Sequence, residues 1–197
     1  TVVDAQVRPA WKIELGGKLT QPVVVDQHLF VARVDAGQVC CLDAATGQSI
    51  WNYIAGGRID SAPTYYKGRL IFGSADGYVY ALIATDGRLA WRFRAAPTDQ
   101  RLMAFEQVES VWPVHGSVLV KNDTAYFCAG RSSYLDGGLF IYGLDPATGT
   151  YNVPYIQRTL GDLPVQVVGV DPHLAHPGGG QRTARRFRIL SVRSIPR

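Results

Sequence analysis

Polar side chains suited to ligand binding or acid–base chemistry gather in one stretch of the sequence, between residues 94 and 136. Guanidinium, carboxylate and imidazole groups follow one another closely there, and long loops within regular sequences often carry function. Arg101, Glu109, His115, Arg131 and Asp136 are therefore candidates for a ligand-binding site. The interpretation that we favour is structural: Arg101, Arg131, Glu109 and Asp136 form salt bridges that hold a long loop in place.

The same stretch permits a more specific hypothesis, that of a hydrolase. Ser117, His115 and Asp136 are the residue types of a nucleophile, a general base and an orienting carboxylate. No GxSxG turn is present to expose the serine, and such a triad is defined by geometry, which a sequence does not show. The hydrolase therefore stands as a third alternative, and the catalytic residues remain unassigned.

Metal binding has weaker support in the sequence. His173 and His176 would share one face of a helix, but prolines flank them and three glycines follow, so a helix is not expected there. No third ligand lies nearby, and we predict no metal site. Cys40, Cys41 and Cys128 are an odd number without metal-type spacing, and we interpret them as ordinary residues of strands.

Composition and charge exclude several classes of protein. The chain of 197 residues, 47% hydrophobic and 18% charged, is long enough for one globular domain. No apolar run approaches about 18 residues, so no membrane span is expected, and no signal peptide is visible at the start. Residues 181–197 contain six arginines and no acid, which accounts for the whole net charge of +4. We therefore expect no nucleic-acid partner, and interpret residues 158–197 as an irregular, partly disordered basic tail.

An internal repeat defines the elements that must position these side chains. The stretches GQVCCLDAATGQSIW (37–51) and GYVYALIATDGRLAW (77–91) agree at six of fifteen positions. A third copy, GLFIYGLDPATGTYNV (138–153), has Val153 where the other two have tryptophan. A period of about forty residues with four short strands per unit is typical of a β-propeller blade.

The repeat sets the expected strands and domain organisation. A leading strand ends at Trp11, and units 12–51, 52–91 and 92–153 follow, so that residues 1–157 form the blades. The expected strands are 22–25, 29–34, 38–42 and 49–53 in the first unit and 62–66, 70–73, 78–82 and 89–93 in the second, with 113–120 and 124–128 as neighbouring strands of the third. The predicted fold is an all-β propeller of about four blades, either part of a larger ring or completed by a second copy through its open blade edges.

The residues shared by the units are expected to be structural. A blade cannot bury its two apolar faces alone, and a tryptophan that closes each unit can wedge between neighbouring blades. We expect this docking role for Trp11, Trp51 and Trp91, with Gly47, Gly87 and Gly149 in the turns that the rings approach.

These residues also carry a resemblance to a known family. The pattern VxxLDAATGxxxW resembles the tryptophan-docking motif of the pyrroloquinoline-quinone (PQQ) type β-propeller repeat, and is similar to the propellers of outer-membrane assembly lipoproteins. The matching residues are Leu42, Asp43, Thr46, Gly47 and Trp51 in the first unit, Leu82, Gly87 and Trp91 in the second, and Leu144, Asp145, Thr148 and Gly149 in the third. The resemblance implies a bacterial protein of the periplasm or cell envelope.

The motif is shared by enzymes and by scaffolds, so it leaves the function open. Our main expectation is a non-catalytic binding or scaffolding module that takes an unknown protein or small-molecule ligand. The alternative is a quinoprotein dehydrogenase that oxidises alcohols or sugars. For such an enzyme the resemblance implies that PQQ and calcium bind at the propeller axis. The two differ in that only the dehydrogenase requires a quinone chromophore and calcium.

Overall fold

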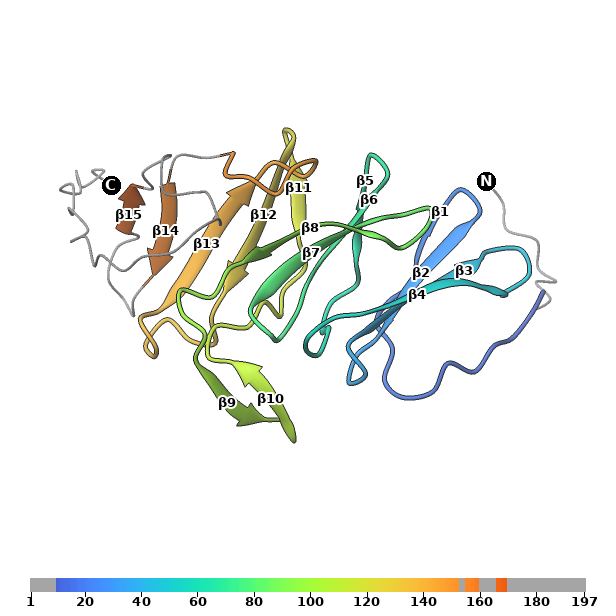
Figure 1. Ribbon diagram of the computed structural model, residues 1–197, viewed down its shortest axis with the longest axis horizontal. Coiled ribbons are helices and arrows are strands. Elements are labelled where there is room, and N and C mark those ends of the chain that lie inside the picture. Colours follow the sequence, from blue (N-terminus) through green and yellow to red (C-terminus); the bar gives the residue numbers. More distant parts are fainter. Residues whose placement is uncertain (1–9, 153–154, 160–165, 170–197) are drawn as a thin grey trace, which may run out of the picture.

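The computed structural model describes residues 10–152, 155–159 and 166–169, and within them it contains three β-sheets, one separate hairpin and no helix. The three sheets stand side by side with their faces toward one another (Figure 1). This arrangement confirms the prediction of an all-β, propeller-type fold. No helix of the described part is long and apolar enough to cross a membrane.

The first two sheets each contain four antiparallel strands in chain order. The first consists of β1 (Val23–Val25), β2 (His28–Arg33), β3 (Gln38–Asp43) and β4 (Ser49–Ile54), and the second of β5 (Thr64–Tyr66), β6 (Arg69–Gly73), β7 (Tyr78–Ile83) and β8 (Leu89–Arg94). All eight strands lie within two residues of the predicted ranges. They were predictable because each is a short apolar run bounded by turns that contain glycine or aspartate.

The third sheet has five strands and departs from the prediction. It consists of β11 (Leu119–Lys121), β12 (Thr124–Ala129), β13 (Leu139–Leu144), β14 (Tyr155–Thr159) and β15 (Gln166–Gly169). The predicted strand 113–120 is wrong except for its end, because Val114 N–H donates to Ser74 O of the second sheet at 3.1 Å instead of pairing with β12. The predicted limit of the blades at residue 157 falls inside β14, and most of the predicted tail lies outside the described residues.

The predicted leading strand, which ends at Trp11, lies outside the described residues except for its last two positions. Trp11 lies in irregular chain, and residues 10–22 touch the first sheet through one isolated bridge between Leu19 and Arg33. Trp11 nevertheless contacts the sheet, since its indole N–H donates to Ala44 O at 3.1 Å.

Apolar side chains fill both interfaces between neighbouring sheets. Phe30 and Phe72 are the largest fully buried side chains between the first and second sheets. Phe127 and Tyr142 fill the corresponding place between the second and third sheets. Each middle strand therefore has buried residues on both of its faces, which explains the continuous apolar runs in β3 and β7.

The tryptophans at the ends of the sheets contact the next sheet. The Trp51 indole N–H donates to Ala84 O at 3.0 Å, and that of Trp91 donates to Pro146 O at 3.0 Å. Gly87 and Gly149 lie against these rings, and a Cβ added at either would be 2.6 Å from the indole. Both glycines have φ of +72°, so glycine is favoured there by conformation as well as by space.

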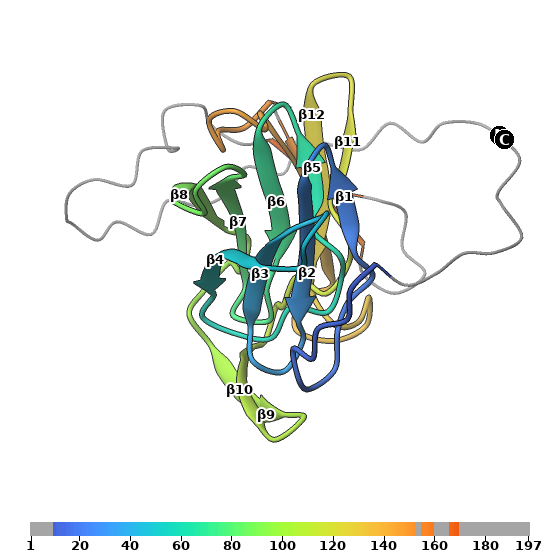
Figure 2. The ribbon, with the colours of Figure 1, turned by 90° about the vertical axis from the view of Figure 1, so that its right-hand side faces the viewer.

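The sheets share one end at which all connections between them lie. Because the strand direction alternates, the turn between the two middle strands of each sheet and the segment that leads to the next sheet meet at the same end. We call this end the connector face, and it contains residues 34–37, 55–63, 74–77, 95–118 and 130–138. The first strands of the sheets, β1, β5 and β11, are neighbours along the molecule (Figure 2).

Candidate functional site

A β-hairpin extends from the connector face beyond the ends of the sheets. It consists of β9 (Arg101–Ala104) and β10 (Gln107–Ser110), and it projects from the body in both views (Figure 1, Figure 2). Its two turn residues, Phe105 and Glu106, have φ of +50° and +62°, as a two-residue hairpin turn requires. One face of the hairpin is turned to the solvent and the other toward the connector face, where Glu109 is buried.

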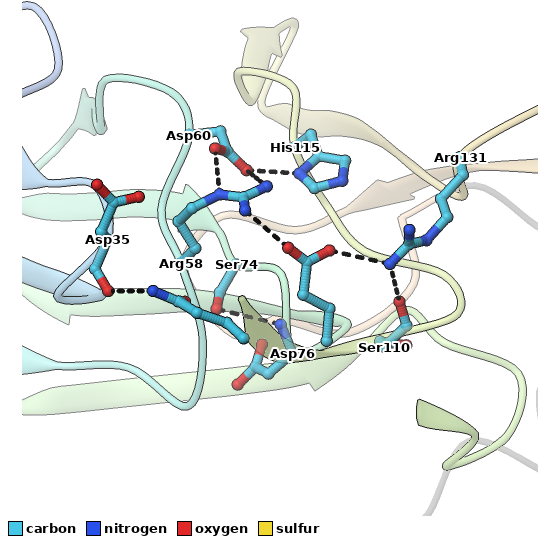
Figure 3. A network of polar contacts seen from close by, with 10 residues as sticks. Asp35, Arg58, Asp60, Ser74, Asp76, Ser110, His115 and Arg131 are labelled. Atoms are coloured by element: carbon cyan, nitrogen blue, oxygen red, sulfur yellow. Dashed lines mark hydrogen bonds and ion pairs between the residues drawn. The ribbon is translucent and has the colours of Figure 1, made fainter. Parts of the chain in front are cut away.

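Glu109 is the centre of a buried ionic network, in which Figure 3 labels Arg58, Asp60, His115 and Arg131. Only 1% of its side chain is exposed, and its two carboxylate oxygens contact different arginines. Arg131 Nη2 donates to Oε2 at 2.9 Å and also to Ser110 O at 3.3 Å. Arg58 Nη1 lies 2.8 Å from Oε1 as an ion pair, although the angle is not that of a hydrogen bond.

The network continues from Arg58 to a histidine. The Arg58 guanidinium is 5% exposed, and its Nε and Nη2 donate to the two oxygens of Asp60 at 2.7 and 3.3 Å. Asp60 Oδ2 is 2.5 Å from His115 Nδ1. These ion pairs link three segments: the connection between the first two sheets, the hairpin, and the 130–138 loop. Two arginines face two carboxylates, so the network without His115 is neutral.

Asp60 is held in its ionised form. Burial on its own would raise the pKa of Asp60, but the hydrogen bonds from His115 and Arg58 outweigh this and lower the pKa to about 2. An ionised Asp60 fixes the orientation of the His115 ring, whose side chain is 33% exposed. The network reaches the solvent mainly through His115 and Arg131, and the Arg131 side chain is 25% exposed. The edge of Asp60 is also open to the solvent.

Two further contacts hold the hairpin. The Arg58 guanidinium carbon lies 4.0 Å from the centre of the Phe105 ring in a cation–π arrangement. Gln107 Nε2 donates to Asp35 O of the first sheet at 2.8 Å. Both contacts lie at or directly beside the turn of the hairpin, and they attach it to the first sheet and to the connection that follows that sheet.

The structure brings together three of the five residues predicted for the site. Glu109, His115 and Arg131 belong to the network, whereas Arg101 pairs with Asp99 on the surface at 3.1 Å. The Asp136 side chain forms no ion pair in the described part of the chain, and its backbone oxygen accepts the Trp112 indole N–H at 2.7 Å.

Arg58 and Asp60 connect the other members, but they were not predicted from the sequence. They lie about fifty residues before Glu109 and His115, in the short connection after the first unit. One feature of the sequence could have indicated them. The connection carries two opposite charges beside a glycine pair, although the repeat requires only a turn at this place.

The arrangement does not contain a serine hydrolase triad. The carboxylate that contacts His115 is Asp60 and not Asp136, and the Ser117 side chain is exposed without a hydrogen bond to His115. Proximity in sequence did not translate into contact because residues 113–118 run along the second sheet.

Among the described residues no group of three histidine, cysteine, aspartate or glutamate side chains could hold a metal ion. His173 and His176 lie outside those residues. Cys40, Cys41 and Cys128 are free thiols, and burial raises the pKa of Cys41 to about 12, with the neighbouring Cys40 adding to the effect.

Since no such group of ligands is present among them, the described residues do not fit a calcium site by themselves. They do not fit a complete site for the tricarboxylate PQQ either, because Arg58 and Arg131 are already neutralised by Asp60 and Glu109.

Sheets of this kind, packed face to face with tryptophan and glycine at each interface, define the chain as a PQQ-type β-propeller protein. The sequence model of the PQQ_2 family, described as outer membrane protein assembly factor BamB, matches residues 1–152. The chain belongs to this family.

Curated relatives with an established name are enzymes. The chain is 29% identical over 107 residues to the dehydrogenase subunit of alcohol dehydrogenase (quinone) of Gluconacetobacter polyoxogenes. This alignment covers 47% of this chain and 14% of that subunit. It is 35% identical over 85 residues to quinohemoprotein alcohol dehydrogenase ADH IIB of Pseudomonas putida, covering 38% of this chain and 12% of that enzyme. The chain thus spans about one seventh of the length of these relatives.

A similar solved structure is a europium-containing methanol dehydrogenase, with a TM-score of 0.59 at 19% identity, over 77% of this chain and 27% of that one. At this identity the likeness concerns the fold. The partial coverage agrees with the prediction that the chain resembles a fragment of a longer propeller.

These comparisons contradict our main functional expectation of a non-catalytic scaffold. The matching curated relatives are alcohol dehydrogenases, which favours the quinoprotein alternative. The error has a physical reason, since the residues that repeat are those that pack sheets against one another, and they are the same whether or not a propeller is an enzyme.

Proposed function

We propose that this chain forms a three-sheet sector of the propeller of a PQQ-dependent alcohol dehydrogenase that works in the periplasm. The observation that carries the proposal is the similarity to quinone-dependent alcohol dehydrogenases from several bacteria, at 28 to 35% identity. The name of the matching family, an outer membrane protein assembly factor, supports the envelope location.

In this proposal the ionic network has a positioning role. It joins the connection after the first sheet, the hairpin and the 130–138 loop, so that His115 and Arg131 are presented at the connector face in fixed orientations (Figure 3). Asp60 orients the His115 ring, and an imidazole so held can exchange a proton with a bound substrate. PQQ would supply the oxidising chemistry when bound, and residues outside the described ones would complete its site.

The proposal is tested on the complete gene product that contains this chain, reconstituted with PQQ and calcium. We expect oxidation of alcohols coupled to reduction of an artificial dye, and loss of that activity when calcium is chelated. An alcohol and sugar panel identifies the substrate class. Absence of dye reduction with every alcohol and sugar, in protein that is folded by circular dichroism, would overturn the proposal.

The role of His115 has its own test within the same assay. His115→Ala is expected to lower kcat/KM about a hundredfold, in the range of a lost acid–base group, without changing the bound quinone. His28→Ala is the matched control, because His28 begins β2 at the opposite end of the sheet and stacks on Phe30. Equal activity of the two variants would remove His115 from the proposed site.

A further inference from the structure

A cavity of about 330 Å³ opens on the connector face of the first sheet. It is lined by Gly16, Gly17, Lys18, Arg33, Asp35 and Ala36. Its volume is within the range of small-molecule sites. Nothing in the network around Glu109 uses these side chains.

Two cations of this cavity have unused hydrogen-bonding capacity. Arg33 donates from Nη1 to Gln38 Oε1 at 2.8 Å, whereas its Nε is shielded from water and has no acceptor. Arg33 Nη2 lies on the cavity side, 3.8 Å from the place where a Cβ on Gly16 would stand. The Lys18 ammonium forms no hydrogen bond or ion pair with the residues that the structure describes. A guanidinium edge with free N–H groups is suited to a planar oxyanion.

The backbone adds donors to the same wall. Gly16 and Gly17 have φ of +70° and +69°, a left-handed conformation that glycine adopts most readily, and both residues line the cavity. The N–H groups of Gly16, Gly17 and Lys18 have no acceptor in the described part of the chain. Gly16, Gly17 and Lys18 are exposed, so these N–H groups are open to the solvent and available to a ligand in the cavity.

The second repeat shows what occupies the equivalent place there. Forty residues later the glycine pair is Gly56 and Gly57, and Asp76 stands where the first repeat has Ala36. The Asp76 carboxylate is buried and lies so close to Gly56 that any side chain at that glycine would collide with it. In the first repeat the alanine leaves this volume open, and the cations Lys18 and Arg33 stand beside it in place of Arg58 and Gly73.

We propose that this cavity is a binding site for a small oxyanion, a carboxylate or a phosphate, which takes the place that Asp76 fills in the second repeat. The anion is bound by Lys18, by the Nη2 side of Arg33 and by the N–H groups of the glycine pair. Asp35 on the same lining leaves an excess of one positive charge, which favours a small anion over a polyanion.

The test is a calorimetric titration of the full chain with inorganic phosphate and, separately, with malonate, at constant ionic strength. We expect a Kd of about 1 mM for one of them, and the tighter of the two identifies phosphate or carboxylate as the ligand class. Lys18→Gln removes the exposed cation, and Ala36→Asp places a carboxylate in the cavity as in the second repeat. Each is expected to weaken binding about fivefold or more.

Lys12→Gln is the matched control, because Lys12 is exposed, pairs with Glu14 at 3.2 Å and lies outside the cavity. The arginines of residues 181–197 contribute a background that is the same in every variant. Equal affinity in the wild type, Lys18→Gln and Lys12→Gln would overturn the proposal, and so would the absence of any binding. If Ala36→Asp fails to fold, Lys18→Gln decides the question, since its side chain is on the surface.

Discussion

Glu109 has 1% of its side chain exposed and is contacted by two guanidinium groups, so its charge is tolerated only because Arg58 and Arg131 are present. A buried ion pair adds little net stability compared with apolar packing, but the loss of one partner leaves the others buried and uncompensated. The network around Glu109 should therefore be sensitive to the removal of any single charge. It links three segments, so this sensitivity extends to the whole connector face.

We expect Glu109→Gln to lower the free energy of unfolding by about 3 kcal/mol, because the 5% exposed Arg58 loses a counter-charge. Urea unfolding of the purified chain measures the change. Asp99→Asn is the control, since Asp99 pairs with Arg101 at the surface, and there the loss should stay below about 0.5 kcal/mol. Similar losses in both variants would show that the Glu109 network does not stabilise the fold.

Asp60 makes a pH-dependent contribution whose sign follows from its lowered pKa. A carboxyl group with a pKa of about 2 in the folded chain, compared with its ordinary value of 3.8, stabilises the fold above pH 4. This contribution, about 2 kcal/mol, disappears as the pH falls from about 4 to about 2. Unfolding measured from pH 7 to pH 2 should show wild type and Asp60→Asn converging at the acid end. A constant difference between them would contradict the assigned pKa.

At the scale of the elements, the contact between a tryptophan and the glycine turn of the next sheet is expected to hold neighbouring sheets together. Gly87 lies against the Trp51 ring, and a Cβ there would stand 2.6 Å from the indole carbons. Gly68 offers a matched comparison, because its φ of +78° is similar and nothing lies within 4 Å of its missing Cβ.

Gly68→Ala should cost about 1 kcal/mol, the cost of the left-handed conformation alone. Gly87→Ala should cost about 1–3 kcal/mol more, because it also displaces Trp51. Thermal or urea unfolding of both variants measures the difference. If the two substitutions cost the same, the docking role that we predict for Trp51 and Gly87 is wrong.

The elements differ in how well the sequence predicted them. The strands of the first two sheets were predictable because each pairs with its neighbour in sequence, through a turn that glycine or aspartate marks. Residues 113–118 resemble a strand but bond to the turn at Ser74, a partner in another sheet that local pattern cannot reveal. Arg58 and Asp60 were missed for the same reason, since only the stacking of sheets brings them to Glu109 and His115.

At the scale of the whole molecule, the first sheet has an apolar face turned away from the second sheet. Val24, Ile50 and Ile54 are on this face, with Val24 58% and Ile54 69% exposed. Side chains on β4 alternate, so Trp51 and Tyr53 pack toward the second sheet while Ile50 and Ile54 point away from it.

We expect the purified chain to self-associate through this apolar face, whereas the sequence predicted pairing through open blade edges. Light scattering after size exclusion should give a mass of at least twice the 21.5 kDa of one chain. Ile54→Glu should shift the protein toward the single-chain mass, whereas Phe105→Glu, on the hairpin, should not. A monomer in the wild type, or equal masses in the two variants, would contradict this expectation.

The proposed membership of a quinone-dependent alcohol dehydrogenase is tested by the quinone content of the complete gene product, purified from its native source. The protein is denatured, and the absorbance of the released cofactor is compared with that of authentic PQQ. We expect a spectrum that matches that of PQQ, with a ratio of about one quinone per propeller. Protein that releases no quinone, and takes up none when PQQ and calcium are added, would contradict it.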